Sequence, residues 1–180
     1  FHIQFRAKTN KITNYVFPVN DIIDIWIDKK KLTPILIQEN ISEGNYKRIN
    51  TIKFFQNKGE AIINNKDTIM FNSNVHSPYS LFYLFRKFDI MNYKDETINL
   101  FQKKNANNIK INVEKEVTLN TNIGEYICTK ISPIRTDSKK FKNKSSISIW
   151  FSEDSKKYPV QIWLKMKYGG LMLKLEEIIN

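Results

Sequence analysis

The sequence has little of what most enzyme and metal sites require. It contains one cysteine, Cys128, and two histidines, His2 and His76, which are far apart in the chain. One cysteine excludes an internal disulfide, and the histidines show neither HxH nor HExxH spacing. The phosphate-binding glycine patterns and the GxSxG motif are also missing. We therefore expect no metal, no cofactor and no enzymatic activity, because no nucleophile–base pair can be named.

Long apolar runs and flexible linkers are missing as well. No segment approaches the roughly 18 apolar residues of a membrane span, so no transmembrane segment is expected. Five glycines and five prolines leave no low-complexity linker, whereas 41% hydrophobic and 13% aromatic residues suffice for a core. We expect a single domain over residues 1–180. Because the chain starts at Phe1 inside an expected strand, we interpret it as a fragment or a processed chain, in which a signal peptide would not be visible.

Arginine is scarce, although the formal net charge is +11. A positive charge of this size favours phosphate backbones or anionic lipid head groups as partners. Arginine is the residue preferred for bidentate recognition of phosphates and bases, and here nearly all the charge is lysine. The lysines are scattered, apart from short runs at 29–31 and 139–144. An A+T-rich coding sequence would give the same bias without selection for binding, and we favour that explanation over nucleic-acid binding.

Apolar and polar residues alternate along most of the chain, which is the pattern of half-buried strands. In DIIDIWID, for example, Ile23, Ile25 and Ile27 share one face. Gly44 predicts a tight turn at 43–45, and Gly169–Gly170 predicts a hairpin between the last two strands. The expected strands cover residues 2–9, 21–28, 35–41, 46–56, 61–64, 67–71, 109–119, 125–131, 146–152, 159–167 and 171–177.

One segment, HSPYSLFYLFRKFDI, departs from this alternation. Ser77 is a good N-cap, and Pro78 suits the first helical position. The segment is apolar on several sides, so it predicts a largely buried helix near residues 78–90. The fold class that follows is all-β with one buried helix: a curved antiparallel sheet that forms an open or partial barrel around the helix.

The three tryptophans fall in the polar phase of their strands. Trp26 alternates with Asp24 and Asp28, and Trp150 and Trp163 likewise stand among polar neighbours. Either the second face of a curved sheet forms an aromatic-bordered groove for an amphiphile, or these rings pack under the helix and over lysine stems at the rim. Both interpretations stay open, and we favour packing.

Other reactive or charged side chains favour structural roles. Arg86 follows the apolar helical run and is expected to anchor the helix through a carboxylate or a carbonyl, with anion binding as the alternative. Cys128 lies in EYICTKI and is expected to be a buried, inert thiol. We interpret the acidic pairs, including Glu114/Glu116 and Glu153/Asp154, as charged side chains exposed to solvent.

Three segments together resemble the DUF3108 family of exported bacterial proteins. SPYSLFYLFR is similar to the family's DPxSxxYxxR signature, EGNYKR to its EGxYKR turn, and IWFSEDSKKYPVQIWLKMKYGG to its WxSxDxxrxPVxixxkxxxG close. Order and spacing agree over nearly the whole chain. The departure is Ser77, where the family usually has Asp; either residue caps a helix, so any special role of that carboxylate is in doubt.

Carried over residue by residue, the family pattern falls on Glu43, Gly44, Tyr46, Lys47, Arg48, Pro78, Ser80, Tyr83, Arg86, Trp150, Ser152, Asp154, Pro159 and Val160. The resemblance implies a periplasmic or outer-membrane-associated location and a curved β-sheet like those of lipoprotein carriers, and it implies no activity. It also implies that the family's N-terminal strand is cut short in this chain.

Together these observations predict a non-enzymatic envelope protein. We expect it to bind a lipid or another amphiphile, or an envelope protein partner, in the concave face of its sheet. The residues expected to contact the ligand are Trp26, Trp150, Trp163, Tyr83 and Arg86. The alternatives are a structural or interaction module that pairs through its surface or a free strand edge, and a lysine-driven nucleic-acid binder, which steep salt dependence would reveal.

Overall fold

The computed structural model describes residues 1–9, 15, 17–72, 74–94, 96–102, 104–135, 147–165 and 170–179. They form two compact units. The first comprises Phe1–Tyr83 and Asn99–Ala106, and the second comprises Leu84–Ile98 and Asn107–Asn180. Within the described residues, no helix is long and apolar enough to cross a membrane. The lysine run at 139–144 lies outside the described residues.

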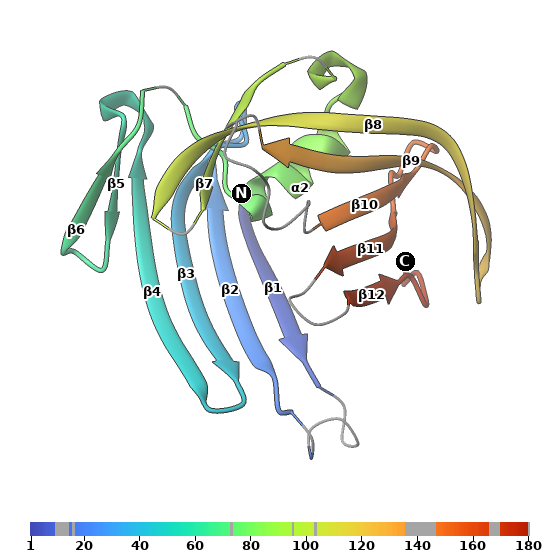
Figure 1. Cartoon of the computed structure of the whole chain (residues 1–180), viewed down its shortest axis with the longest axis horizontal. Coiled ribbons are helices and arrows are strands. Elements are labelled where there is room, and N and C mark those ends of the chain that lie inside the picture. The colour runs from blue at the N-terminus through green and yellow to red at the C-terminus, as the bar shows by residue number, and fades with distance from the viewer. Residues whose placement is uncertain are drawn as a thin grey trace. The chain divides into compact units, whose positions relative to one another are not determined.

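The first unit is built on a six-stranded antiparallel sheet. Its strands lie side by side in chain order (Figure 1). They are β1 (His2–Lys8), β2 (Asn20–Ile27), β3 (Pro34–Glu43), β4 (Tyr46–Phe55), β5 (Glu60–Ile63) and β6 (Asp67–Met70), with the short 3-10 helix η1 (Gln56–Lys58) between β4 and β5. The predicted turn at 43–45 is confirmed, because Glu43 pairs with Tyr46 and Gly44 has φ +58°.

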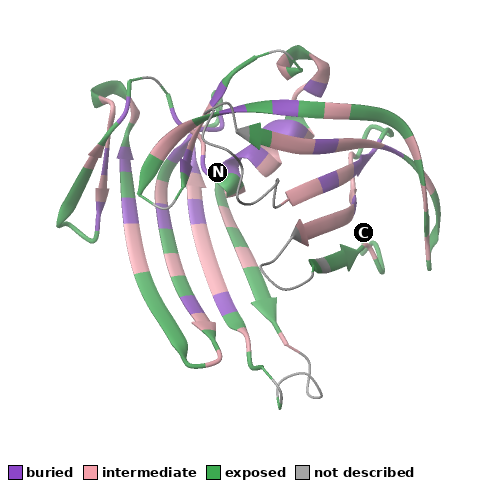
Figure 2. Ribbon diagram, viewed as in Figure 1, coloured by how far each residue is buried: buried purple, intermediate pink, exposed green. Residues whose placement is uncertain are grey.

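A row of isoleucines crosses this sheet and forms its core. Ile25 pairs with Ile37, Ile37 with Ile52, and Ile52 with Ile63, and all four are buried. Because strand side chains alternate between faces, Trp26 points to the opposite face. Figure 2 shows the resulting bands of buried residues along β2, β3 and β4. The predicted alternation is therefore confirmed here.

The α-helix α2 (Pro78–Lys87) begins at the predicted residue. Ser77 and Ser80 cap it reciprocally: Ser80 N donates to Ser77 Oγ at 3.1 Å, and Ser77 N donates to Ser80 Oγ at 2.9 Å. The helix ends three residues before the predicted 90. Asp89 instead caps the 3-10 helix η2 (Ile90–Tyr93), its Oδ1 accepting from Met91 N at 3.0 Å.

The second sheet also has six antiparallel strands, in the order β12-β11-β10-β9-β8-β7 (Figure 1). They are β7 (Ile98–Gln102), β8 (Asn105–Thr121), β9 (Gly124–Arg135), β10 (Ile147–Ser152), β11 (Pro159–Lys165) and β12 (Gly170–Lys174). The antiparallel pairing of β11 with β12 agrees with the predicted hairpin, although residues 166–169 lie outside the described residues.

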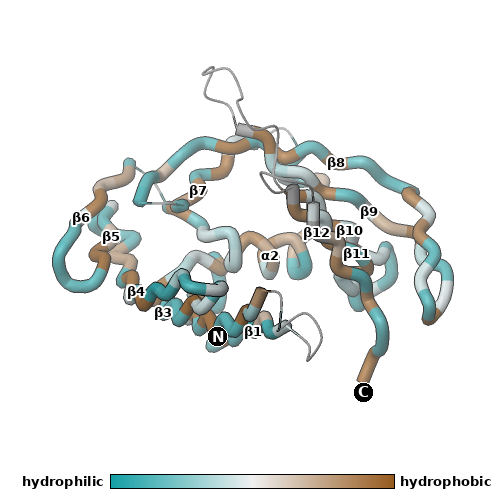
Figure 3. The backbone as a smooth tube through the Cα atoms, turned by 60° about the horizontal axis from the view of Figure 1, so that its bottom comes forward, coloured by the Kyte–Doolittle hydropathy of each residue, from teal (hydrophilic) through white to brown (hydrophobic). Residues whose placement is uncertain are grey.

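A β-bulge interrupts the pairing of β8 with β9. Glu114 faces Lys130 and Val117 faces Cys128, so Lys115 and Glu116 together stand opposite a single residue of β9. Glu116 has φ +57°, in the left-handed region. On the strands before the bulge, hydropathy alternates in the usual way (Figure 3). The bulge shifts this alternation by one residue and so changes which side chains of β8 face the core.

The predicted fold class is confirmed, with differences in detail. The protein is mostly β, its sheets are antiparallel and do not close into a barrel, and α2 is the single α-helix among the described residues. The structure has two six-stranded sheets, where the sequence predicted one curved sheet. Cys128 is buried as predicted, and burial raises the pKa of its thiol to about 11, which makes it inert. The expectation of a single domain stays a prediction.

Candidate functional site

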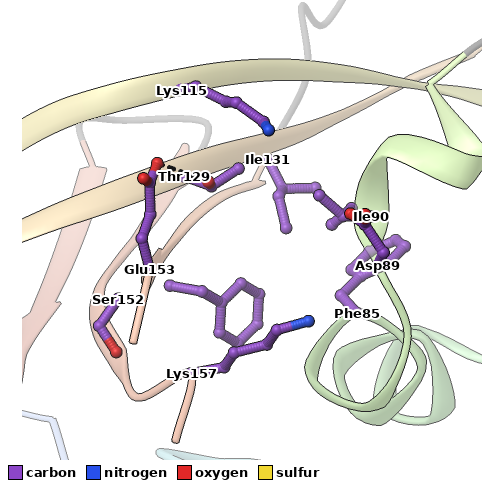
Figure 4. A pocket seen from close by; sticks show the side chains of 10 residues that line it. Phe85, Asp89, Ile90, Lys115, Thr129, Ile131, Ser152, Glu153 and Lys157 are labelled. Atoms are coloured by element: carbon purple, nitrogen blue, oxygen red, sulfur yellow. Dashed lines mark hydrogen bonds between the residues drawn. The ribbon is translucent and has the colours of Figure 1, made fainter. Parts of the chain in front are cut away.

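The second unit contains a pocket of about 380 Å³. Its lining comes from α2 and the residues after it, from the bulge in β8, from β9 and β10, and from the turn that follows β10 (Figure 4). The lining residues are Phe85, Asp89, Ile90, Lys115, Thr129, Ile131, Phe151, Ser152, Glu153 and Lys157. All of them belong to the second unit.

The floor of the pocket is apolar. Phe85, Ile90, Ile131 and Phe151 are each less than 9% exposed. Ile131 pairs with Ile149, and Phe151 follows in the same phase of β10, so these side chains belong to the inward face of the second sheet. An apolar floor of this kind can hold a hydrocarbon group.

Four ionisable side chains surround this floor, and three of them have hydrogen-bond partners within the protein. Asp89 caps η2, as described above. Glu153 Oε1 accepts from Glu116 N at 3.0 Å and from Thr129 Oγ1 at 2.9 Å. Lys157 Nζ donates to the carbonyl of Phe88, just beyond the C-terminus of α2, at 2.9 Å. These contacts connect the walls of the pocket to one another.

The turn after β10 carries the third family-like segment and forms one wall of the pocket. Ser152 Oγ accepts from Tyr158 N at 2.8 Å, and Asp154 Oδ1 accepts from Lys156 N at 2.7 Å and Lys157 N at 3.2 Å. These bonds hold Lys157 in the left-handed region, at φ +48°. Ser152 and Asp154 therefore shape the turn by satisfying its backbone N–H groups.

Arg86 connects α2 to this turn. Its Nη2 donates to the carbonyl of Lys156 at 3.3 Å, so it anchors the helix through a backbone carbonyl, one of the roles expected for it. Pro159 and Val160 start β11 directly after the turn, and Val160 is buried. The helical segment SPYSLFYLFR and the closing segment thus meet beside the pocket, where Arg86 contacts the turn that Ser152 and Asp154 shape.

Trp150 and Trp163 lie on the face of the second sheet that points away from the apolar floor. Trp150 pairs with Lys130, whose Nζ lies 5.6 Å from the Trp150 ring centroid and 3.0 Å from Glu114 Oε1. The Trp163 ring packs on Gly170, where a Cβ atom would collide with it. Both rings are therefore engaged in contacts within the protein, Trp150 with the Lys130 ammonium and Trp163 with Gly170.

Trp26 and Tyr83 belong to the first unit and lie on opposite faces of its sheet. Trp26 stacks on His2 with ring centroids 4.4 Å apart, and His2 Nε2 lies 2.8 Å from Asp24 Oδ1. Tyr83 contacts Phe5 at 6.0 Å between ring centroids, on the core face. The three tryptophans and Tyr83 do not line the pocket. A ligand-binding role for these four residues stays a prediction.

The hairpin between β3 and β4 carries the remaining family-like residues, Glu43, Gly44, Tyr46, Lys47 and Arg48. Gly44 N donates to Pro18 O at 2.7 Å, and a Cβ at Gly44 would lie 2.9 Å from Phe17 Cε2. Arg48 Nη2 donates to Glu39 Oε2 at 3.0 Å. Glycine is needed here for its φ of +58° and for the close approach of the Phe17 ring.

The sequence analysis missed the pocket, and one signal could have indicated it. In IKINVEK, Ile109, Ile111 and Val113 share the inward phase of β8, and Lys115 occupies the next inward position. A lysine in the apolar phase of a strand is unusual, because a buried ammonium is costly unless it is paired or reaches solvent. The sequence analysis interpreted the flanking pair Glu114/Glu116 as solvated charge and assigned no role to the lysine between them.

The described residues offer little for catalysis or metal binding. Ser80 Oγ lies 3.5 Å from His76 Nδ1, but Ser80 is buried and its hydroxyl caps α2. Burial lowers the pKa of His76 to about 4, which makes it a weak base. Among the described residues, no group of three His, Cys, Asp or Glu side chains could hold a metal ion.

Comparison with known proteins gives one match. The family model described as a protein of unknown function (DUF3108) matches residues 1–176 of the 180-residue chain. No curated protein and no solved structure matches the chain. The resemblance seen in the three sequence segments is therefore confirmed over nearly the whole chain.

Proposed function

The chain belongs to the DUF3108 family, and from that premise we propose that it is a non-enzymatic protein of the bacterial cell envelope that binds one hydrophobic or amphiphilic molecule. The observation that carries the proposal is the pocket in the second unit, with its apolar floor and charged rim. We place the ligand there rather than at the tryptophans, because Trp150 and Trp163 face away from that floor.

The size of the pocket supports a small ligand. Ligand pockets commonly measure about 300–1,000 Å³ and are mostly apolar with a few polar groups. At about 380 Å³, this pocket is near the lower end of that range. A single hydrocarbon chain suits it better than a lipid with two chains, and the buried side chains of the floor would exclude water from the bound chain.

The test is isothermal titration calorimetry at pH 8 with two ten-carbon probes, decanoate and 1-decanol. We expect the Ile90→Trp variant to weaken binding of both probes at least tenfold, because the larger side chain occupies the pocket floor. Ile134→Trp is the matched control, since Ile134 is exposed on β9 and does not line the pocket. Its affinities should equal those of the unsubstituted protein.

Binding of neither probe to the unsubstituted protein would contradict the proposal, and so would an Ile90→Trp variant that binds normally. Circular dichroism should show that both variants fold. If Ile90→Trp does not fold, the binding site is located instead by cross-linking a photoreactive decanoate analogue to the unsubstituted protein. Peptide mass spectrometry should find its cross-links in residues 85–90, 129–131 and 151–157; cross-links spread over the chain would argue against the pocket.

The envelope location is a separate part of the proposal. It rests on the export that the family resemblance implies, and the positive net charge of +11 would favour contact with anionic lipid surfaces. Expression of the complete gene, followed by cell fractionation, should recover the protein with the periplasm or the membranes. Recovery in the cytoplasmic fraction would contradict this location and leave the ligand-binding proposal standing.

A further inference from the structure

Lys115 differs from the other charged residues of the pocket. The other three ionisable side chains have hydrogen-bond partners, as described above. Lys115 Nζ has none among the described residues, and it lies at the pocket with its side chain exposed. In Figure 4 the Lys115 side chain extends from β8 toward Ile131. Among the described residues, Lys115 is therefore the one ionisable side chain of the pocket that forms neither a hydrogen bond nor an ion pair.

Two acidic residues beside Lys115, one on β8 and one in the turn after β10, make their contacts with other groups. Glu114, the residue before Lys115, points to the other face and accepts from Lys130 Nζ at 3.0 and 3.1 Å. Glu153 lines the same pocket, but its Oε1 accepts from the Glu116 amide and from Thr129 Oγ1. Glu114 and Glu153 thus each serve another contact, and neither forms an ion pair with Lys115 among the described residues.

The bulge maintains this arrangement at a conformational cost. Glu116 adopts φ +57°, in the left-handed region that a non-glycine residue adopts only at an energetic cost. Its amide would lack a strand partner at this position, and Glu153 supplies the acceptor. Strained residues held by specific contacts are concentrated at functional sites. Lys157, at φ +48°, is a second such residue on the same pocket.

From these contacts we propose that the pocket takes a single-chain amphiphile with an anionic head group, whose head contacts Lys115 and whose chain lies on Phe85, Ile90, Ile131 and Phe151. This inference rests on the proposed function and names the ligand class for that site. A carboxylate or a phosphate monoester would satisfy the same lysine. A neutral head group would form no ion pair with the Lys115 ammonium.

The test compares head groups on one chain length. Decanoate, decyl phosphate, 1-decanol and decyltrimethylammonium are titrated separately at pH 8, below the concentrations at which they form micelles. The unsubstituted protein should bind both anions more tightly than the alcohol, and the cation most weakly. A preference for decyl phosphate over decanoate would assign the head as a phosphate ester, and the reverse would assign it as a fatty acid.

Lys115→Met removes the charge and keeps most of the stem. We expect the ratio of the 1-decanol Kd to the decanoate Kd to fall about fivefold, the effect of losing one partly solvated ion pair. Lys110→Met is the matched control, because Lys110 is exposed on the same strand and points away from the apolar floor. It changes the net charge equally and should leave the ratio unchanged.

The outcomes separate this inference from the proposed function. If all four probes bind equally, or if Lys115→Met leaves the ratio unchanged, the anionic class is wrong while the hydrophobic pocket stands. If no probe binds, the pocket proposal itself fails. If Lys115→Met does not fold, the relative affinities of the unsubstituted protein for the four probes still test the anionic class.

Discussion

His76 and Lys130 illustrate, at the scale of single residues, how polar side chains are accommodated beside apolar packing. The Lys130 ammonium lies over the Trp150 ring and forms an ion pair with the Glu114 carboxylate. His76 is largely buried, and its ring bonds to the backbone of Leu32. Lys130 is thus accommodated by an ion pair, whereas burial favours the neutral form of His76.

The burial of His76 predicts that stability depends on pH between about 4 and 6.5. Burial lowers the pKa of His76 to about 4 in the folded chain, against 6.5 for an ordinary histidine. In this range the unfolded chain binds more protons than the folded chain, so the free energy of unfolding rises with pH. The total change is at most about 3.5 kcal/mol, because the pKa falls from 6.5 to about 4 and one pKa unit corresponds to about 1.4 kcal/mol.

Urea unfolding at pH 7, 6 and 5 measures this dependence. The contribution of His76 is complete above pH 6.5 and is lost as the pH falls toward 4. A His76→Gln variant should show a flatter dependence than the unsubstituted protein over the same range. Equal slopes for the two proteins would show that His76 is not protonated on unfolding.

At the scale of elements, the start of α2 depends on a reciprocal pair of serines. Ser80→Ala would leave the buried Ser77 amide without its acceptor, while Ser77 Oγ would still accept from residue 80. We expect a loss of about 1–2 kcal/mol in the free energy of unfolding. Ser155→Ala, at an exposed position in the turn after β10, should change it by less than about 0.5 kcal/mol. Chemical denaturation measures both, and equal effects would refute the capping role.

The elements also show how far the sequence could predict the structure. Alternation placed Ile25, Ile27 and Trp150 on the correct faces, because period-two burial is a local property of a strand. Ser77 and Pro78 located the start of α2 for a similar reason, since a cap uses neighbouring residues.

The bulge and the pocket could not be predicted in the same way. The bulge at Glu116 depends on Glu153, which is 37 residues away in the sequence. The pocket depends on the meeting of α2, β8 and the turn after β10, which no local pattern encodes. The division of the strands into two sheets is likewise a result of long-range pairing. Lys115, in the inward phase of β8, was the one local signal of the site.

At the scale of the whole molecule, the dominant property is the net charge of +11. Long-range attraction of this sign accelerates the approach of anionic ligands or anionic lipid surfaces, and salt screens it. The same charge would attract nucleic acid without specificity. The charge therefore agrees with the proposed anionic ligand but does not select it, and the selection is made within the pocket.

The most direct test of the central claim is native mass spectrometry of the protein purified from a bacterial host, with solvent extraction of any bound molecule. We predict one bound amphiphile per chain, with a single hydrocarbon chain and an acidic head group, and its loss in the Ile90→Trp variant. A mass equal to that of the chain alone, unchanged after incubation with envelope lipids, would contradict the account and would direct attention to protein partners.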